Sequence, residues 1–199
     1  MLRANDSSLF ALILAAGQGT RFGATKQLAD FGGQPLVRRA VALAESICPG
    51  QSILVLGHEA GAILAAAQPF AGFAVCNANY RDGMGTSLAR GIRALPGHTA
   101  GALVLLCDQP WISAADIERL VNAWRQNPQQ PAACRYGATI GVPAIFPRRC
   151  FADLATLSDD KGAQALIKNN LSQVSLVECL AAARDIDTPE DLAAEPAQH

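Results

Sequence analysis

Three glycines and two cationic side chains follow the first apolar run of the chain, as in loops that bind phosphate groups. The run Leu9–Leu14 is short and uninterrupted, which is typical of a buried strand. The glycines that follow it are Gly17, Gly19 and Gly23. They let the backbone turn tightly and bring its N–H groups close to phosphate oxygens, while Arg21 and Lys26 add positive charge. The stretch therefore predicts a nucleotide-binding loop at the carboxyl end of a strand.

The glycine spacing excludes the two most familiar phosphate loops. A P-loop needs four residues between its glycines and then Gly-Lys-Ser/Thr, and the dinucleotide fingerprint needs Gly-x-Gly-x-x-Gly. The spacing of Gly17, Gly19 and Gly23 fits neither. An ordinary glycine-rich turn between strand and helix is the alternative. Lys26 favours the nucleotide loop, because only three of the 16 basic residues are lysines and one of them ends this stretch.

A carboxylate stands directly after another apolar run. Asp108 follows Leu103–Cys107, so we expect it at the carboxyl edge of the sheet, near the glycine loop. Mg²⁺ that bridges phosphate oxygens prefers hard anionic ligands, which makes Asp108 the first candidate for a metal ligand. The alternative is a turn aspartate, because Asp favours strand ends and Pro110 favours a turn.

Two further carboxylates lie near the end of the sequence. Alternation in Asp185–Asp187 predicts a strand that points both carboxylates to one side and Ile186 to the other. Two acids on one face repel one another unless a cation lies between them. The next residues form a strong helix start, with Thr188 as N-cap, Pro189 in the first helical position and Asp191 in the first turn. This segment therefore has a structural purpose in any interpretation.

The elements that must position these residues alternate between strand and helix. Such alternation is typical of βαβ units and predicts an α/β fold with a mainly parallel sheet. The expected strands are Leu9–Leu14, Ser52–Leu56, Phe73–Cys76 and Ala102–Cys107, followed by shorter ones at Ala132–Arg135 and Val142–Phe146. The expected helices are Pro35–Ile47, Glu59–Gln68, Ser87–Ala94 and Ser113–Gln126, the last one capped by Ser113 with Asp116.

One domain is expected. A chain of 199 residues, of which 50% are hydrophobic, can bury one sizeable core. We expect residues 9–126 to form a nucleotide-binding half and residues 127–192 to extend the sheet over a second substrate, with 193–199 as a frayed tail.

Charge and hydropathy exclude several classes of partner. The formal net charge is −1, and no basic run is interleaved with aromatic residues, so nucleic acid is not an expected partner. The longest apolar runs have the length of strands, which argues against a membrane span. The first residues carry Asp6 before any apolar run and do not resemble a signal peptide, so we expect a cytoplasmic protein.

The cysteines and histidines predict no metal site of their own. The six cysteines form no Cys-x-x-Cys pair, and no histidine stands at ligand spacing from them. In a cytosolic α/β protein, such cysteines are expected to be small buried hydrophobes. The three histidines are assigned no role.

Taken together, the motifs resemble those of one enzyme superfamily. Leu-Ala-Ala-Gly-x-Gly-x-Arg-x-Gly-x-x-Lys at 14–26, Asp-Gln-Pro at 108–110 and Asp-Ile-Asp-Thr-Pro-Glu-Asp-Leu at 185–192 are similar to nucleotidyltransferases with a Rossmann-like fold. Residues 79–88, 141–146 and 159–163 extend the similarity to the molybdenum cofactor nucleotidyltransferases, above all the cytidylyltransferases. The resemblance spans Leu9–Leu192. It implies the three-layer α/β sandwich of the nucleotide-diphospho-sugar transferase fold.

The resemblance implies how the nucleotide would be bound. Arg21 and Lys26 would neutralise the triphosphate and act in catalysis, and Ser87 would help to read the base. The other nucleotide contacts would come from Ala15, Ala16, Gly17 and Gly19.

The resemblance also implies a Mg²⁺-dependent reaction. Asp108 and Asp187 would hold the ion on the α-phosphate, with Asp185 in support. The terminal phosphate of a molybdopterin-type acceptor would attack the α-phosphorus in line, and pyrophosphate would leave. No general base is required, because a phosphate nucleophile is already ionised at neutral pH.

The acceptor is implied to meet loops on the other side of the nucleotide. The candidate contacts are Gly83, Met84, Gly141, Pro143 and Lys161. From residue type alone, the alternatives are an ordinary hydrophobic Met84, a turn at Gly141 and a surface Lys161. A molybdenum hydroxylase apoenzyme or its chaperone would receive the product.

The expected nucleotide is CTP. Guanylyl-transferring relatives carry Leu-Ala-Gly-Gly where this chain has Leu14–Gly17, and the methyl group of Ala16 leaves less room for a purine. Three rival classes stay open: transfer from GTP or to a sugar phosphate, an oxidoreductase on a related sheet, and a non-catalytic carrier of the molybdenum cofactor. The glycine spacing disfavours the oxidoreductase, as does the lack of an acidic residue directly after Leu56.

Overall fold

The computed structural model describes residues 9–19, 22–158, 162–169 and 171–193. Seven strands form one sheet in the order β3-β2-β1-β4-β6-β5-β7. The strands are β1 (Leu9–Ala15), β2 (Ser52–Leu56), β3 (Phe73–Cys76), β4 (Gly101–Leu106), β5 (Ala132–Tyr136), β6 (Thr139–Pro147) and β7 (Ser175–Glu178). Within this sheet, only β6 runs against its neighbours. The predicted α/β fold with a mainly parallel mixed sheet is confirmed.

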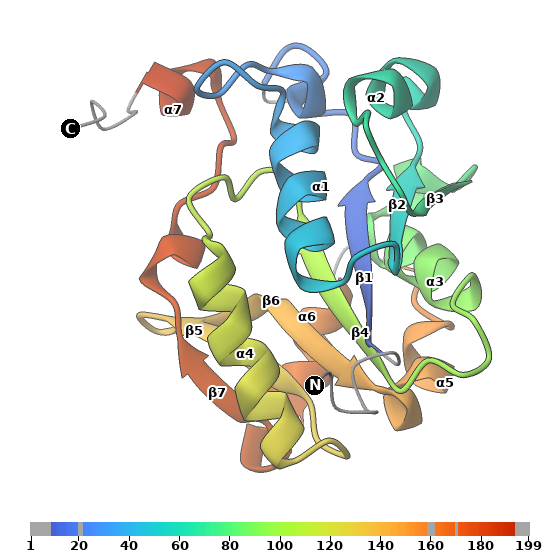
Figure 1. The fold of residues 1–199 in the computed structure, drawn as a ribbon, viewed down its shortest axis with the longest axis vertical. Helices are drawn as coiled ribbons and strands as arrows, with labels where there is room; N and C mark the ends of the chain where they lie inside the picture. Colours follow the sequence, from blue (N-terminus) through green and yellow to red (C-terminus); the bar gives the residue numbers. More distant parts are fainter. Residues whose placement is uncertain (1–8, 20–21, 159–161, 170, 194–199) are drawn as a thin grey trace.

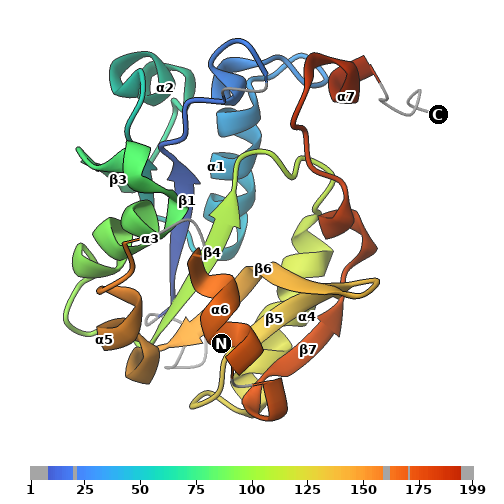
Figure 2. The same cartoon turned by 180° about the vertical axis from the view of Figure 1, so that it is seen from behind.

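Helices cover both faces of the sheet (Figures 1 and 2). One face carries α1 (Leu36–Ile47), α2 (Ala60–Ala66) and α4 (Ala114–Gln126). The other carries α3 (Met84–Arg93), α5 (Phe151–Leu154) and α6 (Gly162–Asn169). The last helix, α7 (Pro189–Ala193), lies at the top of Figure 1, beyond the carboxyl ends of β1 and β4. Short 3-10 turns include η2 (Lys26–Leu28), η3 (Tyr80–Asp82) and η6 (Leu180–Ala183).

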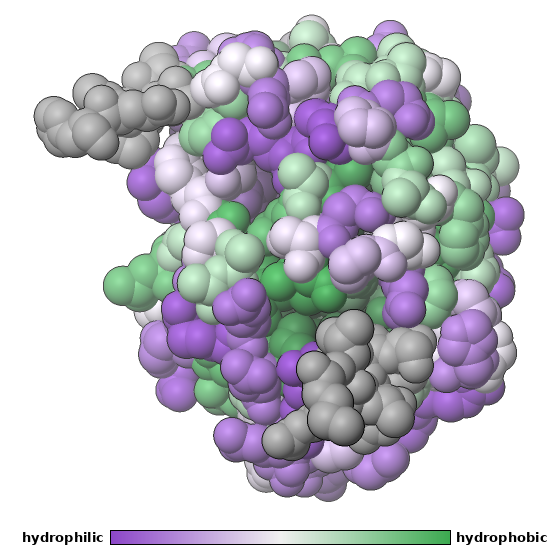
Figure 3. All heavy atoms as spheres, in the orientation of Figure 1, coloured by the Kyte–Doolittle hydropathy of each residue, from purple (hydrophilic) through white to green (hydrophobic). Residues whose placement is uncertain are grey.

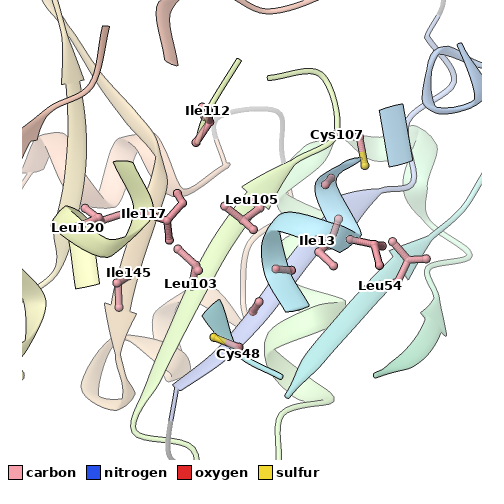
Figure 4. Close-up of a cluster of buried hydrophobic side chains, with 14 of the residues drawn as sticks. Ile13, Cys48, Leu54, Leu103, Leu105, Cys107, Ile112, Ile117, Leu120 and Ile145 are labelled. Atoms are coloured by element: carbon pink, nitrogen blue, oxygen red, sulfur yellow. The ribbon is translucent and has the colours of Figure 1, made fainter. Parts of the chain in front are cut away.

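Alternating side chains of the strands feed two separate apolar layers. In β1, Ala11 and Ile13 belong to the layer that includes α1 and α4, whereas Leu12 and Leu14 belong to the layer that includes α3, α5 and α6. Figure 4 shows the first layer, in which Ile13 and its neighbours on the sheet lie beneath the helices. Every residue of β1 and β2 is buried, as expected for parallel strands covered on both faces.

Part of the first apolar layer reaches the surface. In the orientation of Figure 1, Figure 3 shows apolar side chains in a hollow between α1 and α4, with hydrophilic side chains on either side of it. Most of this layer is fully covered. Leu54 and Ile117 are examples of its residues that have no exposed area.

The start of α3 differs from the predicted one. The sequence predicts a helix from Ser87, and the structure begins it at Met84, directly after Gly83. Glycines at 83 and 85 favour a loop in the sequence. Burial of Leu88 and Ile92 against the sheet outweighs that tendency, and the Thr86 hydroxyl donates to the carbonyl of Gly83 at 2.8 Å in the first turn. β6 also starts three residues earlier than predicted, at Thr139 instead of Val142, and the other strands and helices predicted up to β6 are found within two residues of their expected ends.

The capping of α4 agrees with the prediction. The Ser113 side chain accepts a hydrogen bond from the backbone of Asp116, and the Asp116 carboxylate accepts one from the backbone of Ser113. This capping box places the helix start directly after the loop that carries Asp108.

The predicted strand at Asp185–Asp187 is wrong, because these residues pair with no strand. Ile186 is fully buried in a third apolar cluster with Phe31 and Leu36, and its N–H donates to the carbonyl of Asp108 at 2.8 Å. The packing of Ile186 and this backbone hydrogen bond help to hold the segment beside Asp108 without a partner strand. What matters for the site is that this segment lies beside Asp108.

Five of the six cysteines are buried, as predicted, and all are free thiols. Cys76 is the exception, because it lies on the edge strand β3. Among the described residues, no helix is both long and apolar enough to cross a membrane.

Candidate active site

A pocket of about 410 Å³ opens at the carboxyl ends of β1 and β4. It brings together nine of the residues singled out in the sequence: Ala16, Gly17, Gly19, Lys26, Gly83, Met84, Ser87, Asp108 and Asp187. They come from the loop after β1, the start of α3, the end of β4 and the segment before α7. The carboxyl edge of a parallel sheet is where such loops converge.

Lys26 lies between two carboxylates at the floor of this pocket. Its ammonium donates to Asp108 Oδ2 at 2.8 Å and to Asp187 Oδ1 at 3.1 Å. Only 14% of the lysine side chain is exposed. Burial lowers the pKa of Lys26, but the two carboxylates outweigh it and the pKa lies above its ordinary value. The lysine is therefore a permanent cation in this site.

The carboxylate pair still has capacity for a second cation. One ammonium faces two carboxylates, and Asp108 Oδ1 is buried without a hydrogen-bond partner among the described residues. A buried carboxylate oxygen left unpaired is costly unless another positive group binds it. The donor set thus consists of hard oxygens, which suits Mg²⁺ or Mn²⁺.

Asp185 stands outside the pocket. Burial raises its pKa, and the carboxylates of Asp187 and Asp108 raise it further. It therefore senses the charge of the pair without contacting Lys26 through a described hydrogen bond. The structure thus places Asp187 in the pocket lining and Asp185 outside it, although alternation in the sequence grouped the two.

Gln27, which the sequence analysis did not single out, fixes the glycine loop. Its side-chain amide donates to the carbonyls of Ala15 and Gly17, at 3.3 and 2.8 Å. Gly19 has a φ of +61°, and a Cβ there would lie 2.9 Å from the carbonyl oxygen of Ala24. Glycine is therefore required at this turn. In the sequence, Gln27 could have been noticed only because it directly follows Lys26. A glutamine side chain by itself does not indicate a catalytic or metal-binding role.

Two of the predicted nucleotide contacts, Ala15 and Arg21, are not among the described residues that line the pocket. Ala15 belongs to β1 and is buried in the core, whereas its neighbour Ala16 lines the pocket, so the nucleotide contact through Ala15 stays a prediction. Arg21 lies outside the described residues. Arg81 from η3 is a pocket cation that the sequence analysis did not assign, and its guanidinium lies 5.5 Å from the ring centre of Tyr80, another lining residue.

The predicted acceptor residues divide into two groups. Gly83 and Met84 line the pocket, and Met84 is 47% exposed, unusual for a methionine. Gly141 and Pro143 are buried within β6 and do not line this pocket, so a contact with the acceptor through them stays a prediction. A Cβ on Gly141 would lie 2.8 Å from the Tyr136 hydroxyl, which explains the glycine by packing. Lys161 lies outside the described residues.

Comparison with known proteins places the chain in one family. Residues 11–175 match the MobA-like NTP transferase domain. Nicotine blue oxidoreductase of Paenarthrobacter nicotinovorans is 31% identical over 198 residues, covering 91% of this chain and 93% of that protein. The bifunctional protein GlmU of Trichlorobacter lovleyi is 32% identical over 112 residues, and these are only 24% of GlmU.

Solved structures agree with this placement. Rv0371c from Mycobacterium tuberculosis H37Rv is 27% identical with a TM-score of 0.81, covering 95% of this chain and 97% of that one. The same protein in complex with manganese is 26% identical with a TM-score of 0.75, covering 94% and 96%.

Molybdopterin-guanine dinucleotide biosynthesis protein A from Archaeoglobus fulgidus, 17% identical with a TM-score of 0.66 and covering 92% and 94%, shares the fold. The family match, the relatives and the converging carboxylates and glycine loop agree: this chain belongs to the MobA-like NTP transferase family and is a nucleotidyltransferase of that family.

Proposed function

We propose that this protein is a metal-dependent cytidylyltransferase that moves CMP from CTP onto the terminal phosphate of a molybdopterin-type cofactor and releases pyrophosphate. The observation that carries the proposal is the convergence of Asp108, Asp187 and Lys26 at the end of the glycine loop. Charge that develops on phosphate oxygens in phosphoryl transfer is stabilised by such fixed cations and metal ligands. The product would pass to a molybdenum enzyme or its chaperone.

Asp108 and Asp187 would hold the divalent metal. Within the described residues, no three acidic, histidine or cysteine side chains gather closely enough to hold an ion, so phosphate oxygens of the nucleotide would complete its ligands. Bound there, the ion would supply positive charge to the α-phosphate. Manganese in the complex of Rv0371c supports a divalent metal in this family, and Mg²⁺ is the ion we propose.

The chain's own residues then hold the substrates in line. The backbone of Gly17 and Gly19 would bind phosphate oxygens, and Lys26 would turn from the carboxylates to the triphosphate. Ser87 lines the same pocket and would contact the base. A phosphate nucleophile needs no base, which agrees with a pocket in which no described histidine takes part.

An oxidoreductase is the second candidate, because the relative that matches over most of both chains is named nicotine blue oxidoreductase. The site supports it less well. β2 ends at Leu56 without an acidic residue after it, and the nearest acid, Glu59, accepts a hydrogen bond from the Thr25 hydroxyl at 2.5 Å. A dinucleotide ribose would find its usual carboxylate partner engaged elsewhere.

One assay separates these functions. The protein is incubated with CTP, GTP, UTP or ATP, with Mg²⁺, and with molybdopterin, a sugar phosphate or no acceptor, and pyrophosphate is measured. Oxidation of NADH and NADPH with nicotine blue is measured in parallel. We expect pyrophosphate only when CTP and molybdopterin are present together. Pyrophosphate only with GTP or a sugar phosphate would overturn the assigned substrates, and turnover of the nicotinamide nucleotides without pyrophosphate would favour the oxidoreductase.

A further inference from the structure

Asn77 is a buried polar residue whose amide orientation is fixed by the backbone. It follows β3, is only 6% exposed, and its Oδ1 accepts a hydrogen bond from the N–H of Asn79 at 3.0 Å. A backbone N–H can only donate, so the amide oxygen must face it. The amide nitrogen of Asn77 therefore points the other way, toward the start of α3.

The amide nitrogen of Asn77 sets the direction of two hydroxyl groups. It donates to Thr86 Oγ1 at 2.9 Å and to Ser87 Oγ at 3.0 Å. The Thr86 hydroxyl has acceptors for its own proton in the carbonyls of Gly83 and Asn79, at 2.8 and 2.9 Å. Both amide hydrogens of Asn77 are thus used, and each of the two hydroxyls receives one.

Ser87 is left with a proton to donate. The residue is 4% exposed and lines the nucleotide pocket, and its hydroxyl donates to no acceptor among the described residues. A hydroxyl has one hydrogen and two lone pairs, and the amide of Asn77 occupies one of these lone pairs, which biases the hydroxyl toward donating to its next partner. In this pocket that partner is the ligand.

We infer that Asn77 is a positioning residue that makes the Ser87 hydroxyl a hydrogen-bond donor, so that the pocket selects a nucleobase presenting an acceptor at that edge. This rests on the proposed function. Cytosine presents O2 and N3 as adjacent acceptors, whereas guanine presents two N–H donors on the corresponding edge. A donor fixed at Ser87 therefore favours the pyrimidine by hydrogen-bond polarity, independently of the room that Ala16 leaves.

The test reverses this polarity with Asn77→Asp. A carboxylate has no hydrogen to give, so the Ser87 hydroxyl would donate to it and turn its lone pairs to the pocket. The control is Asn79→Asp, the same chemical change at an exposed residue two positions on, which adds the same charge and leaves its backbone N–H in place. Dissociation constants of CTP, UTP, GTP and ATP are measured calorimetrically without acceptor. Ratios between nucleotides cancel the effect of the added charge on the shared triphosphate.

We expect Asn77→Asp to lower the preference for CTP over GTP by about tenfold, the effect of one buried hydrogen bond, and Asn79→Asp to leave it unchanged. An unchanged ratio in Asn77→Asp overturns the inference. If Asn77→Asp does not fold, Asn77→Ala is measured instead. This variant frees the Ser87 hydroxyl to donate or accept, so its preference for CTP over GTP must be smaller than that of wild type. A wild-type protein that favours another base overturns the proposed use of CTP instead. In that case Asn77→Asp must still change the order in which the four nucleotides bind, and an unchanged order rejects the positioning role of Asn77.

Discussion

Lys26 shows how residue types define a site before its geometry is known. The sequence predicted a cation on the triphosphate and required a cation between neighbouring acids, without connecting the two. In the structure the ammonium of Lys26 contacts Asp108 and Asp187, whereas the sequence had paired Asp187 with Asp185. The two carboxylates were predictable as candidate metal ligands, but their pairing with Lys26 was not. Asp108 lies 82 positions after Lys26 in the sequence, and Asp187 lies 161 positions after it.

The position of Lys26 leads to a prediction about metal and nucleotide binding. Lys26→Ala should lower kcat by the equivalent of about 2 to 4 kcal/mol, since a charge-assisted contact to the leaving group is lost. Affinity for the nucleotide should fall less. Without nucleotide, Mn²⁺ should bind more tightly to the variant than to wild type, because the ammonium no longer competes for the carboxylates.

Steady-state kinetics and the electron paramagnetic resonance signal of free Mn²⁺ measure these quantities, with Lys26→Arg as the charge-keeping control. Weaker Mn²⁺ binding in Lys26→Ala would contradict the competition, and an equal loss in kcat and affinity would place Lys26 in ground-state binding only.

Asp108 and Asp185 form a matched pair of aspartates for mutation. Asp108→Ala should abolish nucleotidyl transfer while the fold persists, because it removes the carboxylate that contacts Lys26 and contributes little apolar packing. Asp185→Ala, outside the pocket, should retain most activity. Initial rates and circular dichroism decide this. Native turnover in Asp108→Ala rejects the metal assignment, and an inactive Asp185→Ala means that the two roles are exchanged.

At the scale of elements, the C-terminal arm (residues 185–193) places Asp187. Asp191 Oδ2 accepts hydrogen bonds from the N–H groups of Asp187 and Thr188, at 2.9 and 2.7 Å, and Ile186 anchors the arm in the apolar cluster with Phe31. The helix start of α7 at Pro189 was predictable from Thr188-Pro189 and the acid in the first turn. The absence of a strand at Asp185–Asp187 was not predictable, because two alternating acids resemble a strand whether or not a partner strand is near.

Asp191 makes the stability of this arm depend on pH. The N–H groups of Thr188 and Asp187 lower the pKa of its carboxyl group below the ordinary value. Its stabilising contribution is therefore complete above the pKa of the unfolded chain and disappears as the pH falls through the lower pKa of the folded protein. Asp191→Asn should lower the urea midpoint at about pH 7 and match wild type at about pH 2.

Glu190→Gln is the control for this comparison, because it removes the same charge one residue earlier and makes no hydrogen bond to the described arm. A difference between wild type and Asp191→Asn that grows as the pH falls would have the wrong sign and reject the anchoring role.

At the scale of the whole molecule, the antiparallel strand β6 joins the two halves of the chain. It lies between β4 and β5 and pairs along β4 from Gly101 to Val104. The alternation of apolar runs predicted the parallel half well, because local patterns suffice for βαβ units. The reversal of β6 was not predicted, since strand direction depends on pairing between distant residues.

This arrangement predicts cooperative unfolding. Without β6, the buried edge of β4 at Leu103 and Val104 would be exposed. We therefore propose that residues 9–126 and 127–192 unfold together in one two-state transition. Fluorescence of Trp111 and Trp124 and far-ultraviolet circular dichroism should give coincident urea curves. Two separated transitions would indicate halves that fold on their own.

The most direct test of nucleotidyl transfer follows the α-phosphorus itself. CTP labelled with radioactive phosphorus at the α position is incubated with the protein, Mg²⁺ and molybdopterin, and the products are separated. The account predicts that the α label appears in the pterin product, that a γ label leaves entirely in pyrophosphate, and that neither transfer occurs with Asp108→Ala. Label that remains in CTP or appears as free CMP, with no labelled pterin, would contradict it.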